Sequence, residues 1–239
     1  MTDPSVLAHE GLTFANPLAS DDVDRAIAAP KLPDGARVLE TGCGAAELLI
    51  RVLERYPTAS GVGVDPDADW LARGRTAADE RIPGRELELV HATVEEAALG
   101  RASFDAVVNV GASHAHGGYP RALGELRSLI PDGGRVLLGE GFWARTPSPE
   151  FLDALGGATE DELGTLDELL AHASTAGLEP VFRATASTRD WARYEETLAA
   201  TAERRGDEGS LAYARRIKER RALPGGTDTL GFVLLVLAR

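Results

Sequence analysis

The chain has 239 residues, 44% of them hydrophobic, and a formal net charge of −13 at pH 7. A chain of this size is able to bury one large α/β core, so we expect a single domain over residues 1–239. Its negative charge would repel nucleic acid and anionic membranes, so we expect a small-molecule partner, no nucleic acid and no membrane. One cysteine excludes an intrachain disulfide, and without an apolar leader or a long apolar run we expect a cytoplasmic protein.

Helical segments alternate with short apolar segments along the chain. We expect helices over residues 22–28, 46–55, 68–81 and 120–129, and strands over residues 37–40, 61–65, 86–91, 106–110, 135–138, 179–186 and 231–238. Nearly continuous apolar strands that alternate with helices indicate a parallel sheet covered on both faces. Residues 191–221 form a charged helical stretch, which we interpret as an insertion between the last two strands.

A glycine-rich turn follows the first expected strand. Gly42 and Gly44 lack a Cβ atom, so the chain is able to turn tightly there and a ligand is able to pack on its backbone. Asp65 stands at the end of the next expected strand, about 25 residues beyond Glu40, where its carboxylate is placed to bind both hydroxyls of a ribose. We therefore predict a nucleotide-cofactor site, in which a side chain at position 42 or 44 would collide with the cofactor rather than unfold the sheet.

The glycine spacing separates two cofactor classes. A dinucleotide fingerprint, Gly-x-Gly-x-x-Gly, needs a third glycine where this chain has Glu47, whose charge would repel a pyrophosphate. The chain also lacks a Tyr-x-x-x-Lys pair, which disfavours a nicotinamide-dependent oxidoreductase. The pattern acidic-x-Gly-x-Gly, which begins at Glu40, instead resembles motif I of the class I S-adenosylmethionine-dependent methyltransferases, whose cofactor is a sulfonium cation.

This resemblance extends over residues 14–239 and is strongest over residues 36–143. Three further family-like segments follow motif I in the family's order, at residues 87–94, 104–114 and 131–140. The resemblance implies an α/β, doubly wound Rossmann-like sheet of about seven strands, mostly parallel with a C-terminal antiparallel strand. We expect the single domain to contain a cap segment, a core and a helical insertion. The N-terminal cap segment is residues 1–30, the core is residues 31–186 and 229–239, and a helical insertion that covers the substrate site is residues 187–228.

The resemblance implies S-adenosylmethionine as cofactor and assigns residues to it. The cofactor-binding residues expected are Glu40, Gly42, Gly44, Asp65, Thr93, Val94 and Asn109. The family usually has an aspartate after the third strand, where this chain has Thr93. The adenine contact therefore falls to Thr93, to the Val94 backbone or to Glu95.

Ligands of open parallel sheets bind at the carboxyl ends of the strands, so we expect the chemistry in the loops that follow them. Methyl transfer needs an aligned acceptor and, for some acceptors, a base that removes a proton. His114 is the best base candidate, because imidazole titrates near neutral pH, although it equally suits a loop-ordering role. Glu140, in the expected loop 139–143, is a second base or holds an ammonium group. The residues expected to bind substrate are Asn16, His116, Tyr119 and Trp143.

Two ligands in the pattern His114-x-His116, without a clear third, are weak support for a metal, so none is expected. The fourth strand ends Asn109-Val110-Gly111-Ala112, which does not resemble the motif of amino-directed nucleic-acid methyltransferases. We therefore expect a small metabolite with an O or N acceptor atom. A non-catalytic cofactor-binding member of the family remains the alternative, and a homodimer is left open.

Overall fold

The computed structural model describes residues 4–239 and contains two compact units. Residues 1–3 of the expected cap segment lie outside the described residues. The larger unit comprises Ser20–Glu140, Leu169–Ala184 and Val233–Arg239. The smaller unit comprises the described part of Met1–Ala19 together with Gly141–Glu168 and Thr185–Phe232.

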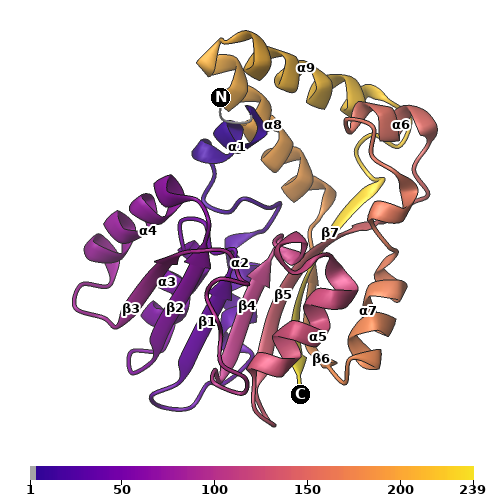
Figure 1. Cartoon of the computed structure of the whole chain (residues 1–239). Coiled ribbons are helices and arrows are strands. Elements are labelled where there is room, and N and C mark those ends of the chain that lie inside the picture. The colour runs from indigo at the N-terminus through magenta and orange to yellow at the C-terminus, as the bar shows by residue number, and fades with distance from the viewer. Residues whose placement is uncertain (1–3) are drawn as a thin grey trace. The chain divides into compact units, whose positions relative to one another are not determined.

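A sheet with strand order β3-β2-β1-β4-β5-β7-β6 forms the centre of the larger unit (Figure 1). Its strands are β1 (Arg37–Thr41), β2 (Ser60–Asp65), β3 (Leu87–His91), β4 (Ala106–Val110), β5 (Arg135–Trp143), β6 (Glu179–Thr185) and β7 (Leu230–Ala238). Every residue of β4 is buried, as expected for a strand covered on both faces. The ends of β5 and β7 continue into the smaller unit.

Strand directions follow from the backbone hydrogen bonds. β1 pairs in parallel with β2 and β4, β2 with β3, and β4 with β5. The N–H of Arg239, just after β7, donates to the carbonyl of Gly134, just before β5, so β7 runs antiparallel to β5. The predicted Rossmann-like sheet, mostly parallel with a C-terminal antiparallel strand, is confirmed.

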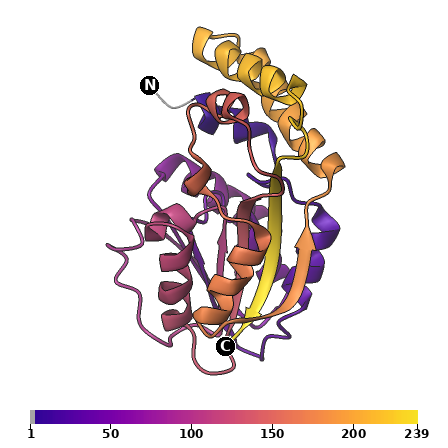
Figure 2. The same ribbon diagram turned by 90° about the vertical axis from the view of Figure 1, so that its right-hand side faces the viewer.

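Helices cover both faces of this sheet. They are α2 (Ser20–Ala28), α3 (Glu47–Arg55), α4 (Ala68–Arg81), α5 (Tyr119–Leu129) and α7 (Leu166–Thr175). In Figure 2, α2 lies on one face while α5 and α7 lie on the other, and α3 contacts both α2 and α4. Asp67 fixes the start of α4, because its carboxylate accepts the N–H groups of Asp69 and Trp70.

Apart from the strand ends that continue into it, the regular elements described in the smaller unit are helices. They are α1 (Pro4–Ala8), η1 (His9–Gly11), α6 (Pro149–Ala154), η3 (Glu160–Glu162), α8 (Thr188–Arg205) and α9 (Glu208–Ala222). Its core contains small and aliphatic side chains, with Ala8, Leu198, Ala202 and Ile217 among them. Arg220 on α9 forms a buried 2.5 Å ion pair with Glu195 on α8, which fixes the register of these two helices.

The N-terminal segment and α8 are joined within the smaller unit. The hydroxyl of Tyr194 donates to the carbonyl of Ala15 at 3.3 Å, and the guanidinium of Arg193 donates to the carbonyl of Leu18 at 3.2 Å. The two segments that the sequence assigns to a cover therefore contact each other. That residues 1–30 and 187–228 cover a substrate site stays a prediction.

The fifth strand is longer than expected. The segment 139–143, expected as a loop because it holds two glycines, continues β5 as far as Trp143. Tertiary packing explains the difference, because Phe142 fills the space left by the missing side chain of Gly231 on β7. A Cβ atom at Gly231 would lie 2.2 Å from the Phe142 ring. Helices α1, α6 and α7 are not among the predicted helices.

Candidate functional site

The glycine turn between β1 and α3 is held by the end of β2. Gly42 and Gly44 have φ angles of 65° and 52°, which glycine adopts without strain. The N–H groups of Gly42 and Cys43 donate to the carbonyl of Val64 at 2.9 and 3.1 Å. The N–H of Gly44 donates to Oδ2 of Asp65 at 2.8 Å. The turn and the end of β2 therefore form one rigid site at the carboxyl edge of the sheet, where ligands of such sheets bind.

The two glycines of the turn have different surroundings. A Cβ atom on Gly42 would lie 2.5 Å from the Cβ of Ala112, in the loop after β4. A side chain at position 42 would therefore meet Ala112 whether or not a cofactor is bound, and that it would collide with cofactor rather than unfold the sheet stays a prediction. A Cβ atom on Gly44 would meet nothing within 4 Å. Gly44 thus leaves open space above the backbone, which a ligand is able to occupy.

Asp65 is 8% exposed and accepts two backbone N–H groups. Oδ1 accepts from Asp67 at 2.8 Å, and Oδ2 accepts from Gly44 at the same distance. An ionised carboxylate offers about four acceptor positions, so two remain for other donors. Asp65 is therefore both an anchor of the turn and an acceptor available to a ribose.

Glu40, near the end of β1, is buried and accepts the N–H of Leu49 at 3.1 Å. It satisfies one of the free N–H groups in the first turn of α3. Burial raises the pKa of Glu40 to about 8, the N–H of Leu49 lowers it, and the charges of Asp65 and Glu47 raise it further. At pH 7 Glu40 is therefore mainly protonated, and only at higher pH would its charge favour a cationic ligand.

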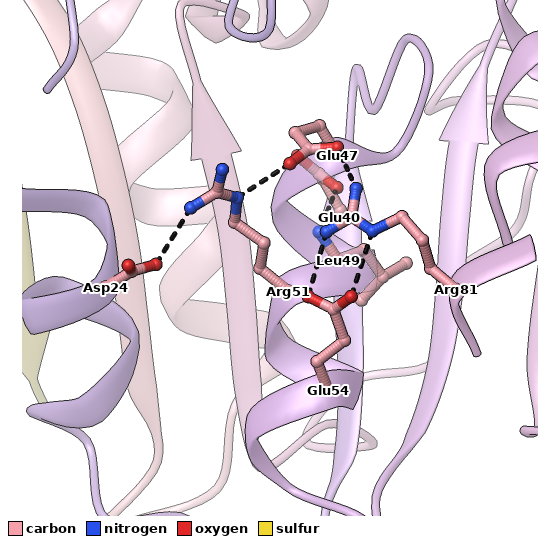
Figure 3. A network of polar contacts seen from close by, with 7 residues as sticks. All are labelled: Asp24, Glu40, Glu47, Leu49, Arg51, Glu54 and Arg81. Atoms are coloured by element: carbon pink, nitrogen blue, oxygen red, sulfur yellow. Dashed lines mark hydrogen bonds and ion pairs between the residues drawn. The ribbon is translucent and has the colours of Figure 1, made fainter. Parts of the chain in front are cut away.

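Glu47 lies in the first turn of α3 within a network of ion pairs (Figure 3). Its carboxylate accepts from Nε of Arg51 at 2.7 Å and from Arg81 of α4 at 2.5 Å. Figure 3 shows Asp24, Glu40, Glu47, Leu49, Arg51, Glu54 and Arg81. Because Arg51 and Arg81 both contact Glu47, its repulsion of a pyrophosphate is weaker than the sequence suggests. The Glu47 argument against a dinucleotide therefore carries less weight.

The residues after β3 stand near the same edge of the sheet. Thr93 is exposed, and both its N–H and its hydroxyl donate to Glu96, at 2.9 and 3.0 Å. Val94 is half-buried and Glu95 is exposed. Thr93 therefore orders the turn after β3 and leaves the Val94 backbone and Glu95 as further candidates for an adenine contact.

Two expected site residues lie in a buried polar cluster, Asn109 in β4 and His116 in the segment that follows it. The amide nitrogen of Asn109 donates to Oγ1 of Thr41 at 2.9 Å and to the carbonyl of Ala112 at 3.2 Å. His116 is 3% exposed and binds Glu125 through Nδ1 and Thr41 through Nε2. Both side chains are therefore engaged inside the protein. Thr41 and Glu125 were not predicted, because Thr41 lies 75 residues from His116 in the sequence and no local motif marks Glu125.

His114 is exposed on η2 (Ser113–His116), the short helix that follows β4. Its position after the central strand is where the sequence places a base. Tyr119 is buried and its hydroxyl donates to the carbonyl of Leu169 at 3.0 Å, so the phenol group links α5 to α7. Burial and the charge of Glu140 raise the pKa of Tyr119. Glu140, in β5, is therefore close to Tyr119.

Asn16 and Trp143 belong to the smaller unit. Trp143 is buried, and its indole N–H donates to the carbonyl of Glu160 at 2.8 Å, while its ring packs against Phe151. Asn16 is half-buried, and its carbonyl accepts the N–H of Leu18. The roles of these residues in substrate binding stay predictions. Among residues 4–239, no three His, Cys, Asp or Glu side chains are grouped as a metal would require.

Comparison with known proteins places the glycine turn in a family. Residues 38–134 match the family described as a methyltransferase domain. Escherichia coli YjhP, an uncharacterized protein, is 27% identical over 168 residues, which are 69% of this chain and 66% of YjhP. A phthiotriol/phenolphthiotriol dimycocerosates methyltransferase of Mycobacterium leprae is 33% identical over 106 residues, 43% of this chain and 36% of that protein. The matched region is thus less than two thirds of each relative's length.

Solved structures match over nearly the whole chain. The crystal structure of a methyltransferase from Geobacter sulfurreducens, in complex with S-adenosyl-L-homocysteine, has a TM-score of 0.86 at 24% identity and covers 99% of both chains. The YjhP structure has a TM-score of 0.83 at 22% identity and covers 98% of both chains. This similarity is one of fold. In the part of the chain that the structure describes, no helix has the length and apolar character to cross a membrane.

Proposed function

We propose that the chain is a class I S-adenosylmethionine-dependent methyltransferase, and that it transfers a methyl group from S-adenosylmethionine to an O or N atom of a small metabolite. The observation that carries this proposal is the glycine turn tied to Asp65. Gly44 offers an open backbone surface, and the carboxylate beside it keeps free acceptor positions.

The charges around the turn fit the proposed cofactor. Asp65 would bind the ribose hydroxyls, and Thr93 or the Val94 backbone would contact the adenine. Asp65 places a carboxylate beside the open surface of Gly44, which suits a cation better than a pyrophosphate. Glu40, whose pKa is raised to about 8 by burial, adds negative charge there only as the pH rises past that value. When bound, the cofactor supplies an electrophilic methyl group on a positively charged sulfur.

The proposed reaction is a single in-line displacement. A lone pair of the acceptor O or N atom forms the new bond to the methyl carbon while the S–CH₃ bond breaks, and its electron pair stays on the sulfur of S-adenosylhomocysteine. An O–H or N–H acceptor loses a proton in this step, and a ring nitrogen of exposed His114 receives it. Glu140 is the second candidate base.

The net charge of the chain and the sequence at the end of β4 support a small molecule, rather than a nucleic acid, as the methyl acceptor. A net charge of −13 opposes binding to a nucleic-acid backbone. The sequence Asn109-Val110-Gly111-Ala112 after β4 does not carry the motif of amino-directed nucleic-acid methyltransferases.

Product analysis tests this function. The full chain is incubated with S-adenosylmethionine and small molecules that carry hydroxyl, carboxyl or amine groups, and S-adenosylhomocysteine and methylated products are measured by mass spectrometry. We expect both products in equal amounts with at least one acceptor. Cofactor binding without product for every acceptor would indicate a non-catalytic binding protein, and a carbon-methylated product would contradict the O or N acceptor.

A further inference from the structure

Four polar side chains inside the larger unit form one continuous hydrogen-bonded network, which consists of Thr41, Asn109, His116 and Glu125. Oγ1 of Thr41 lies 2.9 Å from the amide nitrogen of Asn109 and 3.2 Å from Nε2 of His116. Nδ1 of His116 lies 2.7 Å from a carboxylate oxygen of Glu125. The side chains of Thr41, Asn109 and His116 are buried, and only Glu125, at 40% exposure, reaches solvent.

The donor and acceptor in each hydrogen bond of this network follow from the chemical groups that take part in it. The amide nitrogen of Asn109 only donates, so the Thr41 oxygen accepts from it. The carboxylate of Glu125 only accepts, so a neutral His116 carries its proton on Nδ1 and leaves Nε2 as an acceptor. The Thr41 hydroxyl must then donate to Nε2. Glu125 thus fixes the tautomer of His116, and His116 fixes the direction of the Thr41 hydroxyl.

Glu125 is held ionised by its partners. Partial burial alone would raise its pKa, but the hydrogen bonds from His116 and Arg121 outweigh burial and leave the pKa below its ordinary value. Arg121 contacts the other carboxylate oxygen of Glu125, at 3.0 Å, on the exposed side. Glu125 is therefore a charged acceptor for Nδ1 of His116 at neutral pH.

The hydrogen-bonded network joins the glycine turn after β1 to residues 111–118, two segments that are separate in the sequence. Thr41 immediately precedes Gly42 of the cofactor turn. Asn109 also donates to the carbonyl of Ala112, and His116 ends the short helix that carries His114. Ala112 lies directly against Gly42, leaving no room for a side chain there. A displacement of the turn is therefore transmitted to residues 111–118 by direct contact and by hydrogen bonds.

We propose that His116 is a positioning residue that couples cofactor binding at the glycine turn to the ordering of residues 111–118, the loop that carries the proposed base His114. The proposal rests on the proposed function, because it requires the turn to bind the cofactor. It gives His116 a role different from substrate contact, since both of its ring nitrogens are engaged within the protein.

Hydrogen exchange tests this coupling with S-adenosylhomocysteine as the probe, at saturating concentration for every variant. In the wild type, we expect the probe to slow exchange of amides 111–118 at least about fivefold, the lower end of typical coupling between sites. His116→Asn keeps a donor toward Glu125, but its side chain is too short to place an acceptor where Nε2 contacts Thr41. We therefore expect the probe no longer to slow exchange of amides 111–118 in this variant. His116→Gln places an amide oxygen at that position, so we expect the slowing to return.

Two further variants keep the test independent of His116 itself. Glu125→Ala removes the group that fixes the tautomer, and its solvent-exposed position makes it tolerant of replacement, so we expect it to behave like His116→Asn. Arg121→Ala, the matched control, removes only the exposed partner of Glu125 and should retain the slowing. If wild type binds the probe and both His116→Asn and Glu125→Ala keep the full slowing, the coupling role is wrong. If wild type does not bind the probe, the proposed function fails instead.

Discussion

The backbone N–H of Gly44 donates a 2.8 Å hydrogen bond to Oδ2 of Asp65, so the glycine turn after β1 and the carboxylate that ends β2 form one structural unit. A change at Asp65 therefore acts on two things at the same time. It removes an acceptor for the ribose, and it releases the backbone on which the cofactor would rest.

Replacement of Asp65 tests this double role. We expect Asp65→Ala to weaken S-adenosylhomocysteine binding by about 30-fold or more in calorimetry, since it loses two charge-assisted hydrogen bonds. Asp67→Ala is the matched control. It removes the cap of α4, at a cost of about 1 kcal/mol in the free energy of unfolding, but leaves the turn intact. Equal affinities of wild type and Asp65→Ala would exclude Asp65 from the site.

Gly44 tests whether a ligand occupies the open space above the turn. Gly44→Ala and Gly133→Ala both place a side chain at a positive φ with nothing within 4 Å. Each should therefore lose about 1–2 kcal/mol of stability from backbone strain. Only Gly44→Ala should also lose S-adenosylhomocysteine binding, because Gly133 lies before β5 at the other end of the sheet. Thermal unfolding measures the loss of stability that both variants share, and calorimetry measures the difference in their affinity for S-adenosylhomocysteine. Equal affinities in the two variants would place the cofactor elsewhere.

Glu40 predicts a pH dependence of stability. Its pKa of about 8 in the folded state lies above its ordinary value, so between the two values the folded state binds more protons than the unfolded state. The stabilisation is complete below the ordinary pKa and is lost as the pH rises to about 8, by at most about 1.4 kcal/mol per pH unit.

Urea unfolding of wild type and Glu40→Gln from pH 5 to pH 9 measures this loss. We expect the free energy of unfolding of the wild type, relative to Glu40→Gln, to fall as the pH rises toward 8 and then to level off. A difference that stays constant across this range would show that Glu40 is ionised throughout.

His114 tests the proposed proton transfer. If a ring nitrogen of His114 receives the acceptor proton, His114→Ala should lower turnover by about 10²–10⁴ on an identified acceptor. Affinity for S-adenosylhomocysteine should stay the same, because the side chain is exposed and lies outside the glycine turn. Full turnover by this variant would exclude His114 as the base, and the same measurement on Glu140→Gln would then separate a base at Glu140 from catalysis by alignment alone.

Local sequence patterns predict the core of the fold well. The strand at residues 106–110 and the helix at residues 68–81 have the predicted bounds, because periodicity and the cap at Asp67 act over a few residues. The extension of β5 to Trp143 could not be predicted, since it depends on Gly231 making room for Phe142 about 90 residues earlier.

In the candidate site too, some features follow from local sequence patterns and others depend on tertiary contacts. A known spacing links Gly44 and Asp65 in the sequence, and the structure joins them by a hydrogen bond. Thr41 and Glu125, which bind His116, were not predicted, because strand pairing brings Thr41 to His116 and helix α5 places Glu125 beside it. The sequence assigns His116 to substrate binding, whereas its observed contacts are all internal.

Titration of the full chain with S-adenosylhomocysteine in a calorimeter, beside a titration with NADH, tests most directly whether the glycine turn binds the proposed cofactor. We predict saturable binding of S-adenosylhomocysteine at one site per chain in the wild type, its loss in Gly44→Ala but not in Gly133→Ala, and no detectable binding of NADH. Absence of S-adenosylhomocysteine binding by the folded wild type, or tighter binding of NADH, would contradict the account.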